Sequence, residues 1–296
     1  MKNIDQVSLN FNESSVWVLN VCLALIMFGI ALDLKKSMFV EVLKAPKSLI
    51  CGLIAQWVLL PFFTYLLILL IRPQASLALG MILVASCPGG NISNFFSALA
   101  KSNVELSIIM TSMSSVLAIV LTPFMLNFYG NLYGPTHEIM QLVSLDWWEV
   151  TQAILLIIII PIIVGQLFAR QYPTAAIKVK GFLKYASMGL FLLIVIGAFV
   201  TNYEYFLDYV GLVFFLVLIH NFVAIMSGIG MGTIMRLDIK DIKSLSIEVG
   251  IQNSGLGLLL IFSFFSGLGG MAIIAAWWGI WHIVTGFLMS FIWNKV

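Results

Sequence analysis

Charge is scarce in this sequence. Lysine and arginine number 15 and aspartate and glutamate 13 among 296 residues, so charged residues make up 9% of the chain, against about 25% in soluble globular proteins. A chain with so little charge cannot cover a water-facing surface of its size, which excludes a soluble globular domain and a disordered tail. The same composition excludes a nucleic-acid binder, whereas the net charge of +2 says little about partners, because in a membrane protein the placement of charge matters more than its sum.

Cysteine is equally rare, with three residues in the whole chain. Cys22, Cys51 and Cys87 each lie inside an apolar run. They form no disulfide pattern and match no metal-ligand spacing. A secreted disulfide scaffold is therefore excluded, and no organic cofactor is expected.

Long apolar runs make up most of the chain, in which hydrophobic residues reach 61%. A helix that crosses a bilayer needs about 20 mostly apolar residues, and runs of this length indicate helices rather than a barrel. The sequence therefore predicts an all-α polytopic membrane protein with nine transmembrane helices. The expected spans lie near residues 15–32, 48–71, 75–98, 103–129, 149–168, 182–201, 206–231, 243–265 and 271–293.

The basic residues predict how these spans are oriented. Cytoplasmic loops carry an excess of lysine and arginine, and 13 of the 15 basic residues fall on one side of the expected spans. Only Lys2 and Arg72 fall on the other side, so the N-terminus is expected outside and the C-terminus in the cytoplasm. The 13 are Lys35, Lys36, Lys44, Lys47, Lys101, Arg170, Lys178, Lys180, Lys184, Arg236, Lys240, Lys243 and Lys295.

One carboxylate lies at membrane depth. Glu248 is several residues inside the eighth span, whereas the other acidic residues lie in tails, in loops or near span ends. A buried carboxylate costs several kcal/mol unless it is paired or solvated, and no basic residue lies at a comparable depth. Its partner is expected to be a bound cation, a proton or a polar cavity.

Two spans contain helix-breaking segments near their middles. The third span holds Cys87-Pro88-Gly89-Gly90 followed by polar residues, and the eighth has three glycines and four polar side chains in residues 248–257. Proline and glycine also occur in ordinary membrane helices, where small residues permit close helix contacts. One interrupted span in each half of the chain, however, is typical of an inverted-repeat transporter. Unwound backbone can hold a cation, and the N-termini of the second half-helices suit an anion.

Other polar residues inside the spans leave two interpretations open. Ser107, Thr111 and Ser114 share one face of the fourth span, either to let helices pack closely or to supply oxygen ligands. Gln56 either forms an interhelical hydrogen bond or belongs to a binding site within the membrane. His220 and His282 are neutral packing residues or members of a proton relay.

The two interrupted segments resemble those of the bile acid:sodium symporter family. The similarity includes Cys87-Pro88-Gly89-Gly90 with Ser93-Asn94, and the run Glu248-Val249-Gly250-Ile251-Gln252-Asn253-Ser254-Gly255. It extends to Phe28-Gly29, to Ala45-Pro46-Lys47 ahead of Gln56, and to His220-Asn221. These motifs follow the family order from the first span onward, and together they are highly specific.

The resemblance implies a core domain with two crossed discontinuous helices and a panel domain beside it. The N-terminal tail would be residues 1–14, and the panel would comprise residues 15–32 and 149–201. The core would comprise residues 33–129, broken near 87–91, and 206–293, broken near 249–255. Nine spans would mean that the first span of ten-span bacterial members has no counterpart here.

The resemblance also implies two sodium sites and a substrate site. The first sodium site would use Ser93, Asn94, Ser107, Thr111 and Glu248. The second would use Gln56, Glu248, Val249, Ile251 and Gln252. Substrate would contact Asn91, Asn253 and His282. Oxygen-only ligation suits a hard cation such as sodium.

The expected function is therefore sodium-coupled symport of an organic anion by alternating access. The substrate would be bile-acid-like or a small carboxylate such as pantoate or a 2-keto acid. The expected location is a bacterial inner membrane, and the expected state a monomer. The main alternative is proton-coupled transport through Glu248. An enzyme with Cys87 or a serine near the breaks as nucleophile lacks a triad-like spacing of histidine and carboxylate. A channel is poorly supported because the breaks suggest closed binding sites rather than a continuous pore.

Overall fold

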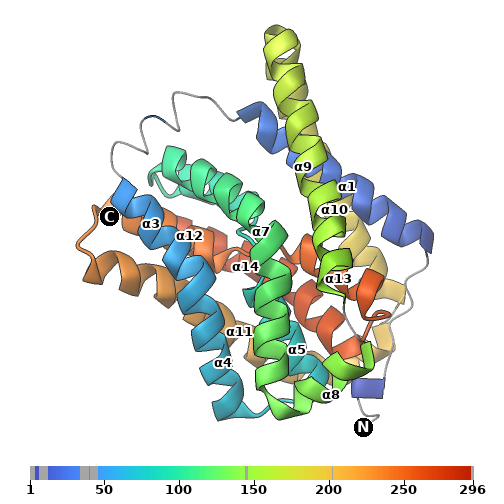
Figure 1. Cartoon of the computed structure of the whole chain (residues 1–296). Coiled ribbons are helices and arrows are strands. Elements are labelled where there is room, and N and C mark those ends of the chain that lie inside the picture. Colours follow the sequence, from blue (N-terminus) through green and yellow to red (C-terminus); the bar gives the residue numbers. More distant parts are fainter. Residues whose placement is uncertain are drawn as a thin grey trace.

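The computed structural model describes residues 4–6, 13–33, 40, 46–143, 146–201 and 203–294. Within these ranges the regular structure is entirely helical, and the strand-like pairing is limited to one isolated bridge (Figure 1). The predicted all-α class is confirmed. Most of the predicted N-terminal tail, the lysine-bearing loop after the first span and the last two residues lie outside the described residues.

The helices follow the apolar runs of the sequence. They are η1 (Ile4–Gln6), α1 (Glu13–Asp33), α3 (Pro46–Ile54), the π-helix η2 (Ala55–Leu59), α4 (Leu60–Ile71), α5 (Ala75–Ala85), α6 (Ile92–Leu99), α7 (Val104–Leu132), α8 (Gly134–Val143), α9 (Trp147–Gln171), α10 (Pro173–Thr201), α11 (Tyr203–Ile234), α12 (Ile239–Gly250), α13 (Ser254–Phe264) and α14 (Gly269–Trp293).

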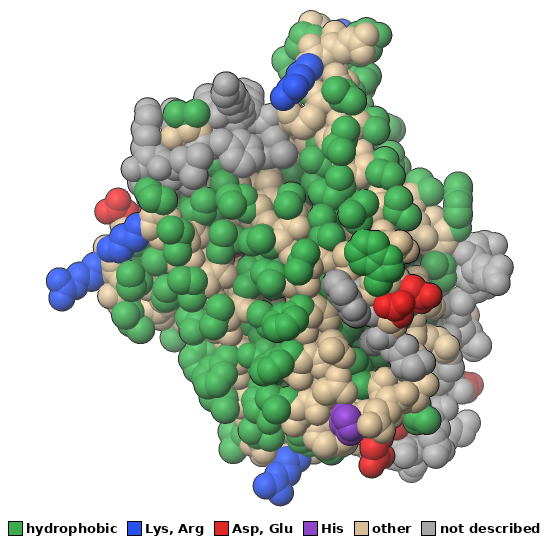
Figure 2. All heavy atoms as spheres, in the orientation of Figure 1, with side chains coloured by type: hydrophobic (Ala, Val, Ile, Leu, Met, Phe, Trp, Pro, Cys, Tyr) green, Lys and Arg blue, Asp and Glu red, His purple; other side chains and the backbone are tan. Residues whose placement is uncertain are grey.

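Five of the described helical stretches are long and apolar enough to cross a membrane, and three shorter apolar helices accompany them. The shorter group includes α5 and α13, each of which is half of an interrupted helix. Large apolar side chains cover most of the face seen in Figure 2, and charged groups lie mainly toward its edges. Exposed apolar surface of this extent marks contact with lipid, so the chain is an integral membrane protein.

Both expected interruptions are present as breaks between half-helices. The first separates α5 from α6 at residues 86–91, where Pro88 cannot donate a helical hydrogen bond. The second separates α12 from α13 at residues 251–253, a shorter break than the expected 249–255. Each pair of half-helices therefore replaces one long membrane helix.

Two groups of helices can be distinguished by their contacts. The first group is α1, α9 and α10, in which α1 packs along the other two helices. The remaining helices form the second group, and α7 of that group contacts α9. In Figure 1, α1, α9 and α10 lie together beside the remaining helices. Close contact in the first group is possible because Gly165 faces α1, where an added Cβ would lie 2.7 Å from Ala31 Cβ.

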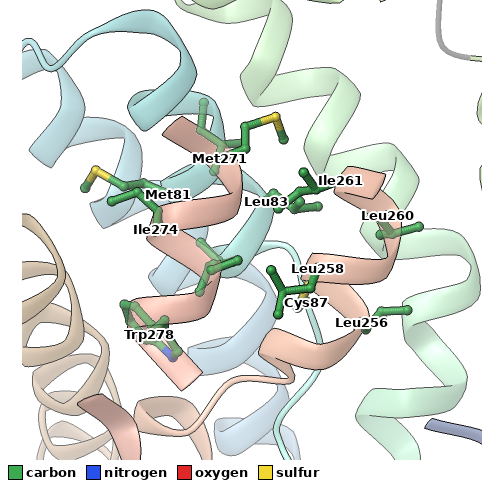
Figure 3. Close-up of a cluster of buried hydrophobic side chains, with 14 of the residues drawn as sticks. Met81, Leu83, Cys87, Leu256, Leu258, Leu260, Ile261, Met271, Ile274 and Trp278 are labelled. Carbon is green, nitrogen blue, oxygen red and sulfur yellow. The ribbon is translucent and has the colours of Figure 1, made fainter. Parts of the chain in front are cut away.

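A continuous apolar cluster surrounds the first break. Figure 3 shows buried side chains from α5, α13 and α14 in this cluster, with Leu258 beside Cys87 and with Met81 and Trp278 farther from it. All of these side chains are buried. On this side, buried apolar side chains cover the polar backbone of the first break, which is therefore not exposed to lipid.

The structure differs from the sequence-based expectation at three further places. A short helix, α8, occupies part of the segment expected to be a loop before the fifth span. Helix α10 begins at Pro173 instead of near residue 182, because its basic first turns continue the helix beyond the apolar run. The helix expected at 48–71 contains the π-helical turn η2.

Helices α11 and α12 approach so closely that only glycine fits at Gly228. A Cβ there would lie 2.6 Å from Ser246 Cα and 2.9 Å from Ser246 N. We expect Gly228→Ala to destabilise the protein by at least about 2 kcal/mol, because backbone must move, and to lower the melting temperature. Gly230→Ala is the matched control, since nothing lies within 4 Å of its Cβ. Equal melting temperatures for the two variants would contradict this account.

Candidate functional site

The two broken helices meet through their unwound backbones. Gly90 N donates to Ile251 O at 2.6 Å, and Asn253 N donates to Pro88 O at 2.9 Å. Between these bonds, Gly89 and Gln252 form an antiparallel bridge. The breaks therefore satisfy each other's backbone groups, as buried polar backbone requires.

The Glu248 carboxylate lies beside this crossover and is fully buried. It accepts hydrogen bonds from Ser93 Oγ at 2.5 Å, from Thr111 Oγ1 at 2.7 Å and from Ser107 Oγ at 3.3 Å. No lysine or arginine of the described ranges pairs with it. A buried carboxylate without a basic partner leaves its negative charge to be balanced by something else.

Asn94 completes a group of six side-chain oxygens, which we call the Glu248 cluster: two from Glu248 and one each from Ser93, Asn94, Ser107 and Thr111. Asn94 Oδ1 lies 2.8 Å from Ser107 Oγ and 3.4 Å from Thr111 Oγ1, and Ser93 Oγ lies 3.3 Å from Thr111 Oγ1. Within the cluster, six pairs of oxygens lie within hydrogen-bond distance of each other. The three hydroxyls carry one hydrogen each, so hydrogen bonds can occupy only three of these six pairs. A cation can use the lone pairs that hydrogens cannot, and hard cations prefer such oxygens.

The helical spacing of the sequence explains how the cluster forms. Ser107 and Thr111 lie one turn apart on α7, and Ser93 lies in the first turn of α6. Further along the same face of α7, Ser114 Oγ accepts from Gly89 N at 3.3 Å. The polar stripe predicted on the fourth span thus faces the first break along its length.

Gly89 permits the carboxylate to approach the crossover. A Cβ at this position would lie 2.1 Å from Glu248 Oε1 and 2.8 Å from Glu248 Cδ. The neighbouring Gly90 is confined by backbone, since its Cβ would lie 2.8 Å from Gln252 O. The two glycines of the sequence motif are therefore required for close approach and not for an unusual backbone angle.

Residues expected for a second cation site also adjoin the crossover. Gln56 and Gln252 are buried and bond each other: Gln56 Nε2 donates to Gln252 Oε1 at 2.8 Å, and Gln252 Nε2 donates to Gln56 Oε1 at 3.2 Å. Gln252 Nε2 also donates to Val249 O at 2.6 Å. Ile251 O accepts from Gly90 N. The structure thus brings Gln56, Val249 and Gln252 together, while the Ile251 carbonyl serves the crossover.

The π-helical turn explains how Gln56 reaches this position. It lies in η2, and its Nε2 also donates to Cys87 O at 2.9 Å within the first break. Single π turns inside α-helices are frequently found at functional sites. No sequence signal marks this turn, because residues 48–71 have the pattern of an uninterrupted apolar helix.

The three residues expected at the substrate site are placed differently. Asn91 is the N-cap of α6, and Asn253 is the N-cap of α13, where its Oδ1 accepts from Leu256 N at 3.0 Å. The crossover brings these caps together, and Asn91 Oδ1 is buried without a hydrogen-bond partner. His282 is buried on α14, and no hydrogen bond of the described ranges joins it to either asparagine.

His220 has the surroundings of a packing residue. Its Nε2 lies 2.7 Å from Thr64 Oγ1, and its ring meets Trp278 edge-on with ring centroids 4.7 Å apart. It makes no hydrogen bond to the Glu248 cluster. This arrangement favours the packing interpretation of His220 over the proton relay.

Two supporting residues were missed by sequence reasoning. Asn221 Nδ2 donates to Gly250 O at 2.7 Å, at the end of α12, and Ser97 Oγ donates to Ser107 Oγ at 3.1 Å. Ser97 lies one turn after Ser93, so helical spacing could have placed it on the same face of α6. Asn221 was noted only as part of a motif, because its partner lies 29 residues away.

The described residues at the crossover do not include a group of side chains arranged for nucleophilic catalysis or for binding a transition metal. Cys87 is fully buried, and within the described residues no three His, Cys, Asp or Glu side chains lie close enough together to hold a metal ion. The polar groups at the crossover are amides, hydroxyls and a single carboxylate. This donor set suits a hard monovalent cation better than a soft or multivalent one.

A helical membrane protein whose two interrupted helices cross beside a buried carboxylate has the architecture of a secondary transporter. Comparison of the sequence with protein families identifies which kind. The model of the sodium bile acid symporter family matches residues 20–209, well over half of the chain. The chain belongs to the sodium bile acid symporter family.

Individual relatives agree with this assignment. The uncharacterized sodium-dependent transporter YocS of Bacillus subtilis (strain 168) is 32% identical over 293 residues, 98% of this chain and 88% of YocS. The probable chloroplastic sodium/metabolite cotransporter BASS1 of Arabidopsis thaliana is 26% identical over 276 residues, which are 93% of this chain and 66% of BASS1. The human P3 protein is 30% identical over 235 residues, 75% of this chain and 46% of P3.

Family membership settles the broad class of activity. The protein is a sodium-dependent transporter and not an enzyme, and the family resemblance seen in the sequence motifs is confirmed. Sodium as the coupling ion weighs against the proton-coupled alternative.

Proposed function

We propose that the protein is a symporter that uses two sodium ions to move an organic anion by alternating access. The observation that carries this proposal is the buried Glu248 carboxylate, which has no basic partner and is surrounded by hydroxyl oxygens at the helix crossover. A sodium ion balances the carboxylate charge and uses the oxygen lone pairs left over by the three hydroxyl hydrogens.

The first ion binds among Ser93, Asn94, Ser107, Thr111 and Glu248. The second ion binds between Gln56 and Gln252 with carbonyl oxygens of residues 248, 249 and 251. Support for the second site is the pairing of the two amides beside Val249 O. Binding there requires both amides to turn their oxygens toward the ion, so the amide pair gives way when sodium enters.

The chain crosses the membrane nine times, with two inverted structural repeats that place the broken helices in opposite directions. The antiparallel bridge between Gly89 and Gln252 supports opposite directions at the crossover. The excess of basic residues on one side of the spans supports an external N-terminus and a cytoplasmic C-terminus. The membrane is a bacterial inner membrane, and the protein works as a monomer.

The anion binds at the paired N-termini of α6 and α13, beside Asn91 and Asn253. Helix N-termini attract negative charge through free N–H groups and the helix dipole. At Asn91 the donors for an anion are the side-chain Nδ2 group and the free backbone N–H groups of α6, because an amide oxygen can only accept. The substrate is a bile-acid-like anion or a small carboxylate such as pantoate or a 2-keto acid, and the word metabolite in the name of BASS1 supports the second class.

Alternating access arises from movement of a panel, helices α1, α9 and α10, against a core formed by the other membrane helices. The contacts of α1 along α9 and α10 support a panel that moves as a unit. Sodium orders the crossover within the core and prepares the helix N-termini for the anion.

The first test is thermal unfolding of the purified protein in NaCl and in KCl at equal ionic strength. At sodium ten times its Kd, binding stabilises the folded state by about 1.4 kcal/mol, which corresponds to a rise in melting temperature of about 3 °C. We expect this rise in NaCl alone, and it allows carboxylates to be screened with sodium present. Identical curves in both salts at several hundred millimolar would contradict sodium binding at the crossover.

A further inference from the structure

Helices α7 and α12 run side by side in a fixed register. Five hydrogen bonds join α12 to α7 and its N-cap, and their partners are separated in sequence by 138, 137, 141, 141 and 137 residues. A nearly constant separation means that the two helices are parallel, and the bonds fall at two levels. Two of these bonds belong to the Glu248 cluster, and the other three lie where both helices begin.

Asp241 forms hydrogen bonds at the N-terminal end of the contact between α7 and α12. Its Oδ2 accepts from Ser48 Oγ at 2.5 Å, and its Oδ1 accepts from Asn103 Nδ2 at 2.8 Å. Asn103 is the N-cap of α7 and accepts from Leu106 N at 3.1 Å. The Asp241 carboxylate thus joins the first turn of α12 to α3 and to the residue that starts α7.

Ser244 strengthens the same junction one turn later. Its Oγ lies 2.8 Å from Asn103 O and 3.0 Å from Ser102 Oγ. Ser102 in turn bonds Ser97 O, and Ser97 Oγ donates to Ser107 Oγ of the Glu248 cluster. Hydrogen bonds therefore connect the Asp241 junction to the cluster along the flank of α6.

We propose that Asp241 is a positioning residue for the first sodium site, an inference that rests on the proposed function. Glu248 follows Asp241 by seven residues, about 10 Å along the helix axis. A slip of α12 by one residue would move the carboxylate by about 1.5 Å and rotate it by about 100°, which would remove it from the hydroxyls of α7. By fixing the register at its start, Asp241 sets the geometry that sodium meets at Glu248.

The experiment is a sodium titration of the melting temperature for the parent, Asp241→Ala and Asp238→Ala. Asp238 is exposed at the N-cap of the same helix, and its side chain makes no capping bond. We expect Asp241→Ala to raise the sodium concentration at half-maximal shift about tenfold, the equivalent of one interhelical hydrogen bond or two. We expect Asp238→Ala to leave it within about twofold of the parent, although both changes remove one negative charge near the helix N-terminus.

Asp241→Asn is the conservative variant, because its Oδ1 still accepts from Asn103 and its amide can donate to Ser48. We expect it to restore the parent's sodium midpoint. A lower melting temperature in KCl with an unchanged sodium midpoint would show a merely structural role and overturn the inference. If Asp241→Ala does not fold, Ser48→Ala takes its place, with an expected shift of about threefold that an unchanged midpoint would refute. A parent without any sodium response would refute the proposed function itself, and the positioning role with it.

Discussion

Replacing Glu248 with glutamine is expected to abolish sodium-dependent transport and the sodium-dependent rise in melting temperature. The amide keeps the shape of the side chain. Of the Ser93 and Thr111 hydroxyls, the one that faces Nε2 can accept from it and the other can still donate to the amide oxygen, so the fold is retained. What is lost is the charge: two unit charges 4 Å apart attract by about 4 kcal/mol at an effective dielectric constant of 20. That energy corresponds to about a thousandfold in Kd. Sodium titration of thermal unfolding measures the loss of sodium binding, and radiolabelled uptake in vesicles measures the loss of transport.

Glu138→Gln is the matched control for this change. Glu138 is exposed on α8, so the same chemical replacement leaves the crossover untouched. The control is expected to keep the parent's sodium midpoint and uptake. Wild-type-like sodium coupling in Glu248→Gln would remove the carboxylate from the ion-binding mechanism.

Gly89→Ala is expected to weaken sodium binding about a hundredfold, the equivalent of about 2.7 kcal/mol. The added methyl group would lie 2.1 Å from Glu248 Oε1 and 3.2 Å from Glu248 Cγ, so the carboxylate has to leave its three hydroxyl donors. Because the obstructed group is the end of a side chain, the backbone can remain in place. The expected signature is therefore a lost sodium response with a melting temperature in KCl close to the parent's.

Alanine variants of two other glycines near the crossover distinguish a specific loss of sodium binding from a general loss of stability. Gly257→Ala would bring a methyl group 3.7 Å from Cys87 Sγ, an ordinary contact, and is expected to behave like the parent. Gly90→Ala would approach the carbonyl of Gln252 at 2.8 Å, so it is expected to lower the melting temperature in both salts. An unaltered sodium midpoint in Gly89→Ala would contradict the position assigned to the Glu248 carboxylate.

Much of this architecture could be predicted because its signals are local. Apolar runs located the helices, and Pro88 with its neighbouring glycines marked the first break within a few residues of its observed place. Glu248 stood out because a carboxylate inside an apolar span needs a partner. The count of nine spans and the division into core and panel remain predictions, as do the ions and the substrate.

The missed features depend on contacts between distant residues. Ser48 and Asp241 lie 193 residues apart, and the sequence around either residue does not predict that the two form a hydrogen bond. The π turn at Gln56 adds one residue to a helical turn without altering the apolar pattern. Helix α8 begins with Gly134 and Pro135, residues that indicate a turn as readily as the start of a helix.

The crossover also constrains the order in which this chain can complete its fold. Ser93 and Glu248 are 155 residues apart, and the unwound segment around Gly90 pairs its backbone with residues close to Glu248. During synthesis the first half of the chain therefore enters the bilayer before the groups that satisfy it exist. Backbone left unpaired in lipid costs several kcal/mol for each group, so this segment must remain hydrated or shielded at the insertion machinery until the second half arrives.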